Sequence, residues 1–109
     1  MPTGRLGTAN ITTTADTTVY TVPASTFSVV SVNIVNRSSS ATANIRIAVA
    51  STATPTVAEY IEYDSQLVAN GVLERTGIVM DAGKLIVVST PTATPTLSVV
   101  VYGIETSTA

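Results

Sequence analysis

One acidic segment in the middle of the sequence has side chains whose types and spacing could do chemistry. Glu59, Glu62 and Asp64 stand in the run Glu-Tyr-Ile-Glu-Tyr-Asp. Because side chains alternate between the two faces of a strand, Glu62 and Asp64 would share one face with Tyr60, and Glu59 would lie on the other with Tyr63. Two carboxyl groups on one face could serve glycoside hydrolysis or supply oxygen ligands to calcium. We expect instead a charged strand edge that blocks edge-to-edge pairing, and the sequence leaves cation binding open.

The residues that most enzymes use are absent. The chain contains no His and no Cys, which excludes Ser-His-Asp and Cys-His catalysis, thiolate nucleophiles and the commonest zinc ligands. Its one lysine, Lys84, follows an Asp-Ala-Gly turn and is expected to be an exposed turn cation. Its six glycines are isolated and form no phosphate-binding loop. We therefore expect a protein that is not an enzyme and has no catalytic residue, metal ligand or cofactor.

The charge pattern narrows the classes of partner. Only 11% of the residues are charged and the net charge is −2. The five basic residues are scattered, so they form neither a phosphate-binding cluster nor a basic amphipathic stretch, and we expect no nucleic acid or membrane partner. The first residues have no apolar signal core, so we expect synthesis in a cytoplasm. A nearly neutral surface favours association with other protein molecules.

The elements that must position these residues are strands. Threonine and valine are abundant, and β-branched side chains pack well on a pleated surface. Short apolar runs broken by Gly, Pro, Asn and Ser predict an all-β fold, a single-domain antiparallel β-sandwich of jelly-roll type with about eight strands. We expect one domain over residues 1–109, a short N-terminal arm over about 1–8 and a frayed C-terminal tail over about 105–109.

Individual strands can be placed from turn residues and from alternation with a period of two. Asn70 and Gly71 form the pair typical of a tight hairpin turn, which predicts that the strands on either side of them are paired. The expected strands are Leu6–Thr12, Thr17–Val22, Phe27–Val35, Ala43–Val49, Val57–Tyr63, Gln66–Ala69, Val72–Arg75 with a continuation over Ile78–Met80, Leu85–Ser89 and Leu97–Ile104.

Some of these strands are apolar on both faces, although one core hides only one face. Leu97–Ile104 and Leu85–Val88 are the clearest cases, and Val29 and Val30 in the third strand are another. We expect another chain to cover the second face, the alternative being a loop or the N-terminal arm of the same chain. Tyr60 and Tyr63, expected on opposite faces, would divide between core and contact, and Arg75 would pair with Glu74. The residues expected to make contacts are Arg5, Leu6, Tyr60, Tyr63, Leu85, Val87, Val100, Tyr102 and Ile104.

Several stretches look familiar when read in order. They are Leu-Gly-Thr-Ala-Asn, Val-Tyr-Thr-Val-Pro-Ala, Val-Asn-Ile-Val-Asn-Arg-Ser, Glu-Tyr-Ile-Glu-Tyr-Asp and Gly-Val-Leu-Glu-Arg-Thr-Gly-Ile. Together with the strand up to Ile104, from Leu6 onward, they resemble small virion structural proteins of tailed phages, especially those of cyanophage type. The resemblance implies a β-sandwich that assembles on a capsid or a tail, with no catalytic residues to carry over.

This resemblance gives the expected function. The first expectation is a capsid decoration or cement protein that forms a homo-oligomer, with a trimer favoured, and bridges major capsid subunits. Contacts would come from Leu85–Val88 and Leu97–Ile104, and the arm around Gly4–Gly7 would lie along the capsid. The alternatives are a tail, neck or baseplate component, such as a fibre-attachment domain, and a carbohydrate-binding module. The expected location is the virion, after synthesis in the host cytoplasm.

Overall fold

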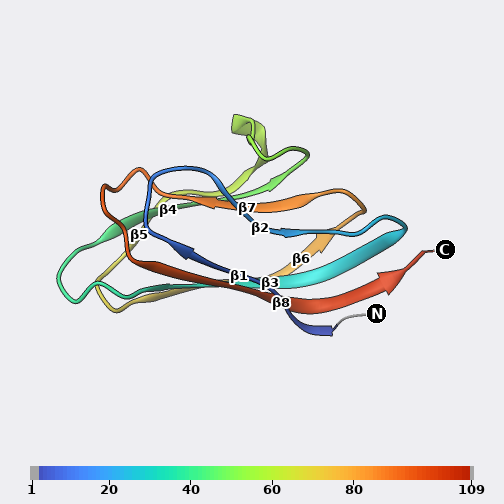
Figure 1. Ribbon diagram of the computed structural model, residues 1–109, viewed down its shortest axis with the longest axis horizontal. Coiled ribbons are helices and arrows are strands. Elements are labelled where there is room, and N and C mark those ends of the chain that lie inside the picture. The colour runs from blue at the N-terminus through green and yellow to red at the C-terminus, as the bar shows by residue number, and fades with distance from the viewer. Residues whose placement is uncertain (1–2, 109) are drawn as a thin grey trace.

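Two four-stranded antiparallel sheets make up the protein. The computed structural model describes residues 3–108. Sheet A has the strand order β1-β8-β3-β6 and sheet B has the order β2-β7-β4-β5, and Figure 1 shows them as two layers. The elements are β1 (Thr3–Ile11), β2 (Thr17–Thr21), β3 (Thr26–Asn36), β4 (Ala43–Ala50), the 3₁₀-helix η1 (Val57–Glu59), β5 (Tyr60–Leu67), β6 (Val72–Met80), β7 (Leu85–Ser89) and β8 (Leu97–Ser107). The predicted all-β sandwich is confirmed, and the strand orders of the two sheets are those of a jelly roll.

The core lies between the two sheets because alternate residues of each strand point inward. In β3 the burial pattern alternates along the whole strand, with Val30, Val32 and Ile34 buried. The inward residues of β8 meet the same core, and sheet B supplies its share from β4 and β7, including Ile47 and Ile86. The period-two pattern in the sequence therefore gives the inner face of these strands correctly. The body is elongated, with extents of 47 × 27 × 19 Å.

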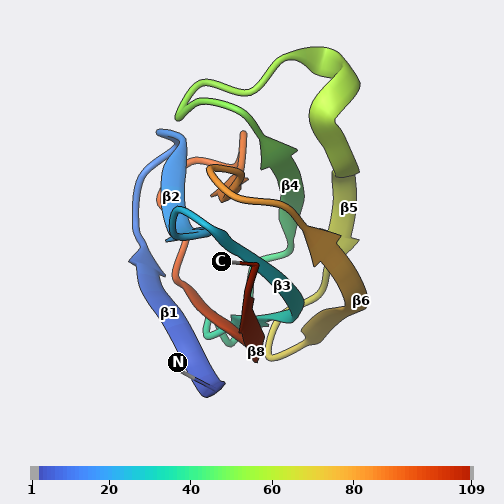
Figure 2. The same ribbon diagram turned by 90° about the vertical axis from the view of Figure 1, so that its right-hand side faces the viewer.

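The two sheets stack so that their edge strands lie one above the other. Figure 2 shows β1 beside β2 on one side of the sandwich and β5 beside β6 on the other. Arg75 of β6 spans the second gap, since its Nη1 donates to the carbonyl of Ile61 on β5 at 3.1 Å and pairs with the Glu62 carboxylate. In the described part of the chain, no helix is long and apolar enough to cross a membrane.

The expected hairpin at Asn70-Gly71 is wrong. β5 belongs to sheet B and β6 to sheet A, so this turn carries the chain from one sheet to the other. A hairpin turn of the expected type needs positive φ at both central residues, but only Asn70 has it, at 58°. The turn is held from outside as well, because the Asn70 amide donates to the Ser38 carbonyl at 3.0 Å.

The expected strand Val57–Tyr63 begins later than predicted. Its first three residues form η1, because the Glu59 carboxylate folds back and accepts hydrogen bonds from the backbone amides of Thr56 at 2.9 Å and Ser51 at 3.1 Å. β5 therefore begins at Tyr60 and continues to Leu67.

Both expected ends of the fold need correction. The expected arm is largely strand, because β1 begins at Thr3 and pairs with β8. The expected frayed tail is wrong up to Ser107, since β8 pairs with β3 as far as Thr26 and the Thr108 amide donates to the Ser25 carbonyl at 2.9 Å. Residues 1, 2 and 109 of these expected segments lie outside the described residues.

Candidate interaction surface

The outer face of sheet A carries a row of exposed apolar side chains. Val29 of β3 lies between Ile104 of β8 and Val79 of β6, and each is its direct partner in the strand register. Their exposed fractions are 40%, 58% and 71%, respectively. Side chains directly opposite each other on neighbouring strands are close enough to touch, so the three form one continuous row across the sheet.

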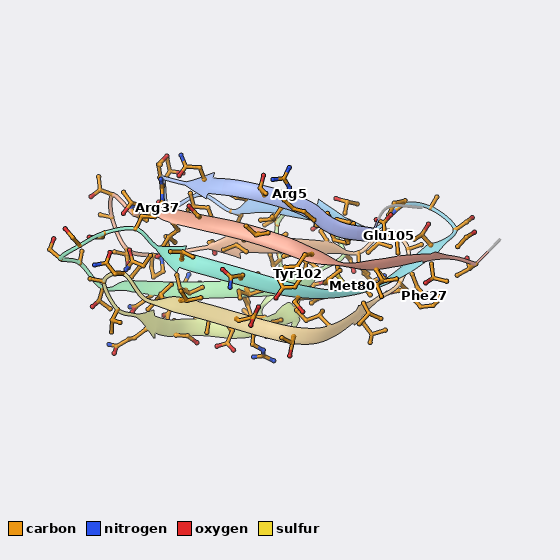
Figure 3. All side chains as sticks on the ribbon, turned by 90° about the horizontal axis from the view of Figure 1, so that it is seen from below. Arg5, Phe27, Arg37, Met80, Tyr102 and Glu105 are labelled. Atoms are coloured by element: carbon orange, nitrogen blue, oxygen red, sulfur yellow. The ribbon has the colours of Figure 1, made fainter. Side chains whose placement is uncertain are left out.

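Two aromatic residues extend this row along the strands. Phe27 precedes Val29 by two residues on β3, and Tyr102 precedes Ile104 by two residues on β8, so both lie on the same face. Each is more than a third exposed. Figure 3 looks onto sheet A and shows Tyr102 near its middle and Phe27 toward one end. We name Phe27, Val29, Val79, Tyr102 and Ile104 the outer apolar patch.

Opposite charges stand at the two sides of the outer apolar patch. Arg5 on the edge strand β1 is exposed and is the register partner of Tyr102. Glu74 lies on β6, the other edge strand, and its carboxylate accepts a hydrogen bond from the Tyr102 hydroxyl. This hydrogen bond raises the pKa of Tyr102, because it stabilises the protonated hydroxyl beside a carboxylate. The Tyr102 ring must therefore lie across β3 to reach Glu74.

Part of the outer face of sheet B, around Val87, is covered by the chain itself. Ala48, Ala50 and Val87 form a second, small buried cluster, against which Tyr60 and Leu85 pack. Val87 is only 1% exposed, so it has no surface to offer to another chain and is not available as the expected contact residue. Of the two clearest strands apolar on both faces, β7 is therefore covered within the chain, and β8 keeps an exposed outer face.

Tyr60 and Tyr63 lie together, so the expectation of opposite faces is wrong. Their ring centroids are 5.1 Å apart in an edge-to-face arrangement. The guanidinium of Arg46 lies 4.3 Å from the centroid of the Tyr63 ring and pairs with Asp64 at 2.6 Å. Alternation fails between them because the β4–β5 register shifts between Ile47, the partner of Glu62, and Ala48, the partner of Tyr60.

The three acidic residues of this segment have separate partners. Glu59 caps η1, Glu62 accepts hydrogen bonds from Ser65 and Arg75, and Asp64 pairs with Arg46. The pKa of each carboxyl is lowered: at Glu59 by backbone amides, at Glu62 by Ser65 and then Arg75, and at Asp64 by Arg46.

The expected pair of Arg75 with Glu74 is wrong as well. Neighbouring residues of a strand point to opposite faces, so Arg75 reaches Glu62 of β5 while Glu74 takes the Tyr102 hydroxyl on the outer face.

A buried polar pair that the sequence reading missed joins the two sheets. The Tyr20 hydroxyl of β2 donates to the Glu105 carboxylate of β8 at 2.5 Å, and both side chains are buried. Burial, and then this hydrogen bond, raise the pKa of Tyr20 to about 12. A signal was present, because Glu105 continues the odd-numbered series of Leu97, Val99 and Val101 that points inward.

The structure divides the nine residues expected to make contacts between the two sheets. Tyr102 and Ile104 belong to the outer apolar patch, and Arg5 and Val100 lie on the same face of sheet A. Leu6 sits at a register shift in β1 and packs against the core. The other four, all on sheet B, are Tyr60, Tyr63, Leu85 and Val87.

Phe27 and Val79 were missed in the sequence, and Val29 was expected in a strand apolar on both faces but not among the contact residues. Phe27 and Val29 alternate with the buried residues of β3, and Val79 stands between Ile78 and Met80, so the signal was the outward phase of two strands.

The structure describes no pocket within residues 3–108. The same residues contain no group of three or more His, Cys, Asp or Glu side chains placed to hold a metal ion. No family model, curated protein or solved structure matches the chain.

Proposed function

We propose that the protein is a structural protein of a tailed-phage virion, most specifically a capsid decoration or cement protein. In this role it associates with its own copies and bridges major capsid subunits. The observation that carries the proposal is the outer apolar patch, which no part of the described chain covers. Contiguous exposed apolar surface of this kind usually marks a contact with another protein.

A decoration role suits a surface of this size. Each copy offers a few apolar side chains and isolated charges, which give a weak single contact. Bound copies that also touch one another make several weak contacts at once, and linked contacts raise the effective affinity by orders of magnitude. Such a layer adds contact area to a shell without enzymatic chemistry.

The fold and the sequence add support of different kinds. Jelly rolls occur in viral capsid domains and also in lectins, so the fold alone does not decide the function. The resemblance of the ordered sequence stretches to small phage virion proteins favours the virion over the lectin class. The exposed Tyr63 offers little to a sugar ring, because the Arg46 guanidinium already occupies one face of its ring.

The test uses particles of the phage that encodes the chain. Deleting the gene should lower the temperature at which the particles release their DNA, and supplying the wild-type chain should restore it. The variant Val79→Asp, which places a charge in the outer apolar patch, should restore it poorly. Val57→Asp is the matched control, because Val57 is 88% exposed on η1, away from sheet A. This variant should restore the release temperature fully.

Copy number separates the main alternative. A decoration protein is present in hundreds of copies per particle, whereas a tail, neck or baseplate component is present in few. A stained gel of purified particles measures this number. Unchanged DNA release in depleted particles together with a low copy number would favour the tail alternative, and absence from the particle would overturn both.

A further inference from the structure

We infer that the outer apolar patch binds a second copy of this chain, face to face, about a two-fold axis that runs parallel to the strands between β8 and β3. The inference rests on the proposed function only for the role that the pair has in the particle. The pairing is tested on the purified protein alone.

The strand order determines which residues meet. A two-fold axis in this position places β8 of one copy opposite β3 of the other, and β1 opposite β6. Because Ile104 and Val29 are register partners, Ile104 of one copy then faces Val29 of the second copy, and the reverse contact follows by symmetry. The Ile104–Val29 part of the patch is thereby covered by its own counterpart, and Val79 on β6 comes to lie opposite β1 of the second copy.

The position of Tyr102 fits the same axis. Its hydroxyl reaches Glu74 on β6, so the ring lies over β3, beside the proposed axis. The two-fold operation brings the two Tyr102 rings together at the centre of the contact. Aromatic pairs at such a centre contribute more than their buried area alone.

The charges at the sides of the patch are complementary under this operation. Arg5 on β1 comes to lie over β6 of the second copy, which carries Glu74. The register places Glu74 beside Asn33 and Arg5 at the level of Ser31, an offset of two residues along the strands. Two residues span about 6.6 Å, which an arginine side chain can bridge. The symmetry makes this ion pair twice.

The area of the face approaches that of a standard protein–protein interface. Four strands spaced by about 4.8 Å, over nine residues rising about 3.3 Å each, cover roughly 600 Å² in the plane of the sheet. Pleating and side chains raise the accessible area toward the roughly 800 Å² per partner of a standard interface. The chain carries a net charge of only −2, so two copies repel each other weakly.

Other arrangements use the charges less well. An axis perpendicular to the strands through Val29 would place Val29, Ile104 and Val79 each against its own counterpart, but it would carry Arg5 away from Glu74. A cyclic trimer needs two different contact surfaces on each copy. Among residues 3–108 the outer apolar patch is self-complementary in both apolar side chains and charge, so a pair is proposed in place of the trimer expected from the sequence.

The first experiment measures association by sedimentation velocity over 1–200 µM. The wild-type chain should form a dimer, and Val79→Asp should raise its dissociation constant at least tenfold. Val57→Asp should leave it unchanged, and thermal denaturation should show that both variants remain folded. Arg5→Glu and Glu74→Arg should each weaken the dimer, and the double variant should restore it. A wild-type chain that stays monomeric at 200 µM, or a dimer insensitive to Val79→Asp, would overturn the inference.

The second experiment tests the axis. The chain has no cysteine, so Val29→Cys and Ile104→Cys each introduce a unique thiol. With a short bis-maleimide, an equal mixture of the two variants should cross-link faster than either variant alone. Faster cross-linking of Val29→Cys with itself would contradict the parallel axis.

The two proposals fail in different ways. A chain that dimerises as described but is absent from particles would overturn the virion function and leave the pairing intact. A chain that is monomeric yet abundant in particles would overturn the pairing and leave the virion function intact.

Discussion

At the scale of single residues, stability depends on polar groups that join the two sheets. Tyr20 and Glu105 lie buried on opposite sheets and are hydrogen-bonded at 2.5 Å. A buried polar group that loses its partner costs about 1–3 kcal/mol, so neither residue can be replaced freely. The consequence can be tested through pH, because the folded and unfolded states differ in their affinity for the Tyr20 proton.

At alkaline pH, the stability of the folded protein depends on Tyr20. Its pKa is raised from 10.0 to about 12 in the folded protein, so its contribution is complete below pH 10 and is lost as pH rises from 10 through 12. This amounts to a loss on the order of 2 kcal/mol. Urea unfolding of the wild type and of Tyr20→Phe between pH 8 and 12 measures it. The wild type should lose its excess stability over this range, and parallel curves for the two proteins would contradict the assignment.

At acidic pH, the stability of the folded protein depends on Glu62, which links the edge strands β5 and β6. Its pKa is lowered by Ser65 and Arg75, so its contribution is present above the unfolded value near 4.5 and disappears as pH falls below it. Glu62→Gln should therefore be less stable than the wild type at pH 7 and equally stable near pH 2. Asp64→Asn is the control, because the pair of Asp64 with Arg46 lies within sheet B and its carboxylate is more exposed than that of Glu62. An equal pH response in both variants would show that bridging the sheets adds nothing.

At the scale of elements, one glycine marks where β1 and β2 approach closely. A Cβ at Gly7 would overlap the carbonyl oxygen of Val19, which is backbone and cannot turn aside. Gly7→Ala should therefore cost about 1–3 kcal/mol, as expected for overpacking. Thr8→Ala, at an exposed neighbouring position, should stay within about 0.5 kcal/mol of the wild type. Urea unfolding of both variants decides this, and equal stability would mean that the two strands can separate at little cost.

The strands could be predicted from the sequence better than the connections between them. Alternation identified β3, β4 and β8 and their inner faces because one core imposes a period of two. It could not show that Asn70-Gly71 joins two sheets, because that depends on the distant Ser38 carbonyl. Nor could it separate Val87 from Ile104, since both lie in strands apolar on both faces. Only the fold shows that Ala48, Ala50 and Tyr60 cover the outer side of Val87.

At the scale of the whole molecule, association with a second copy explains why apolar side chains stay exposed outside the core. The two inner sheet faces form the core, and the outer apolar patch lies on the outer face of sheet A. Part of the candidate surface was predictable from sequence, since Tyr102 and Ile104 follow from the outward phase of β8. Phe27 and Val79 were not expected there, because only the strand order shows that β3 and β6 lie next to β8.

The most direct test of the proposed function is an image reconstruction of the phage particle at a resolution that places strands. We predict many copies on the outside of the shell, arranged in pairs with their sheet A faces together, each pair spanning neighbouring capsid subunits. A reconstruction of particles that contain the chain's gene but show no density for it on the shell would contradict the decoration role.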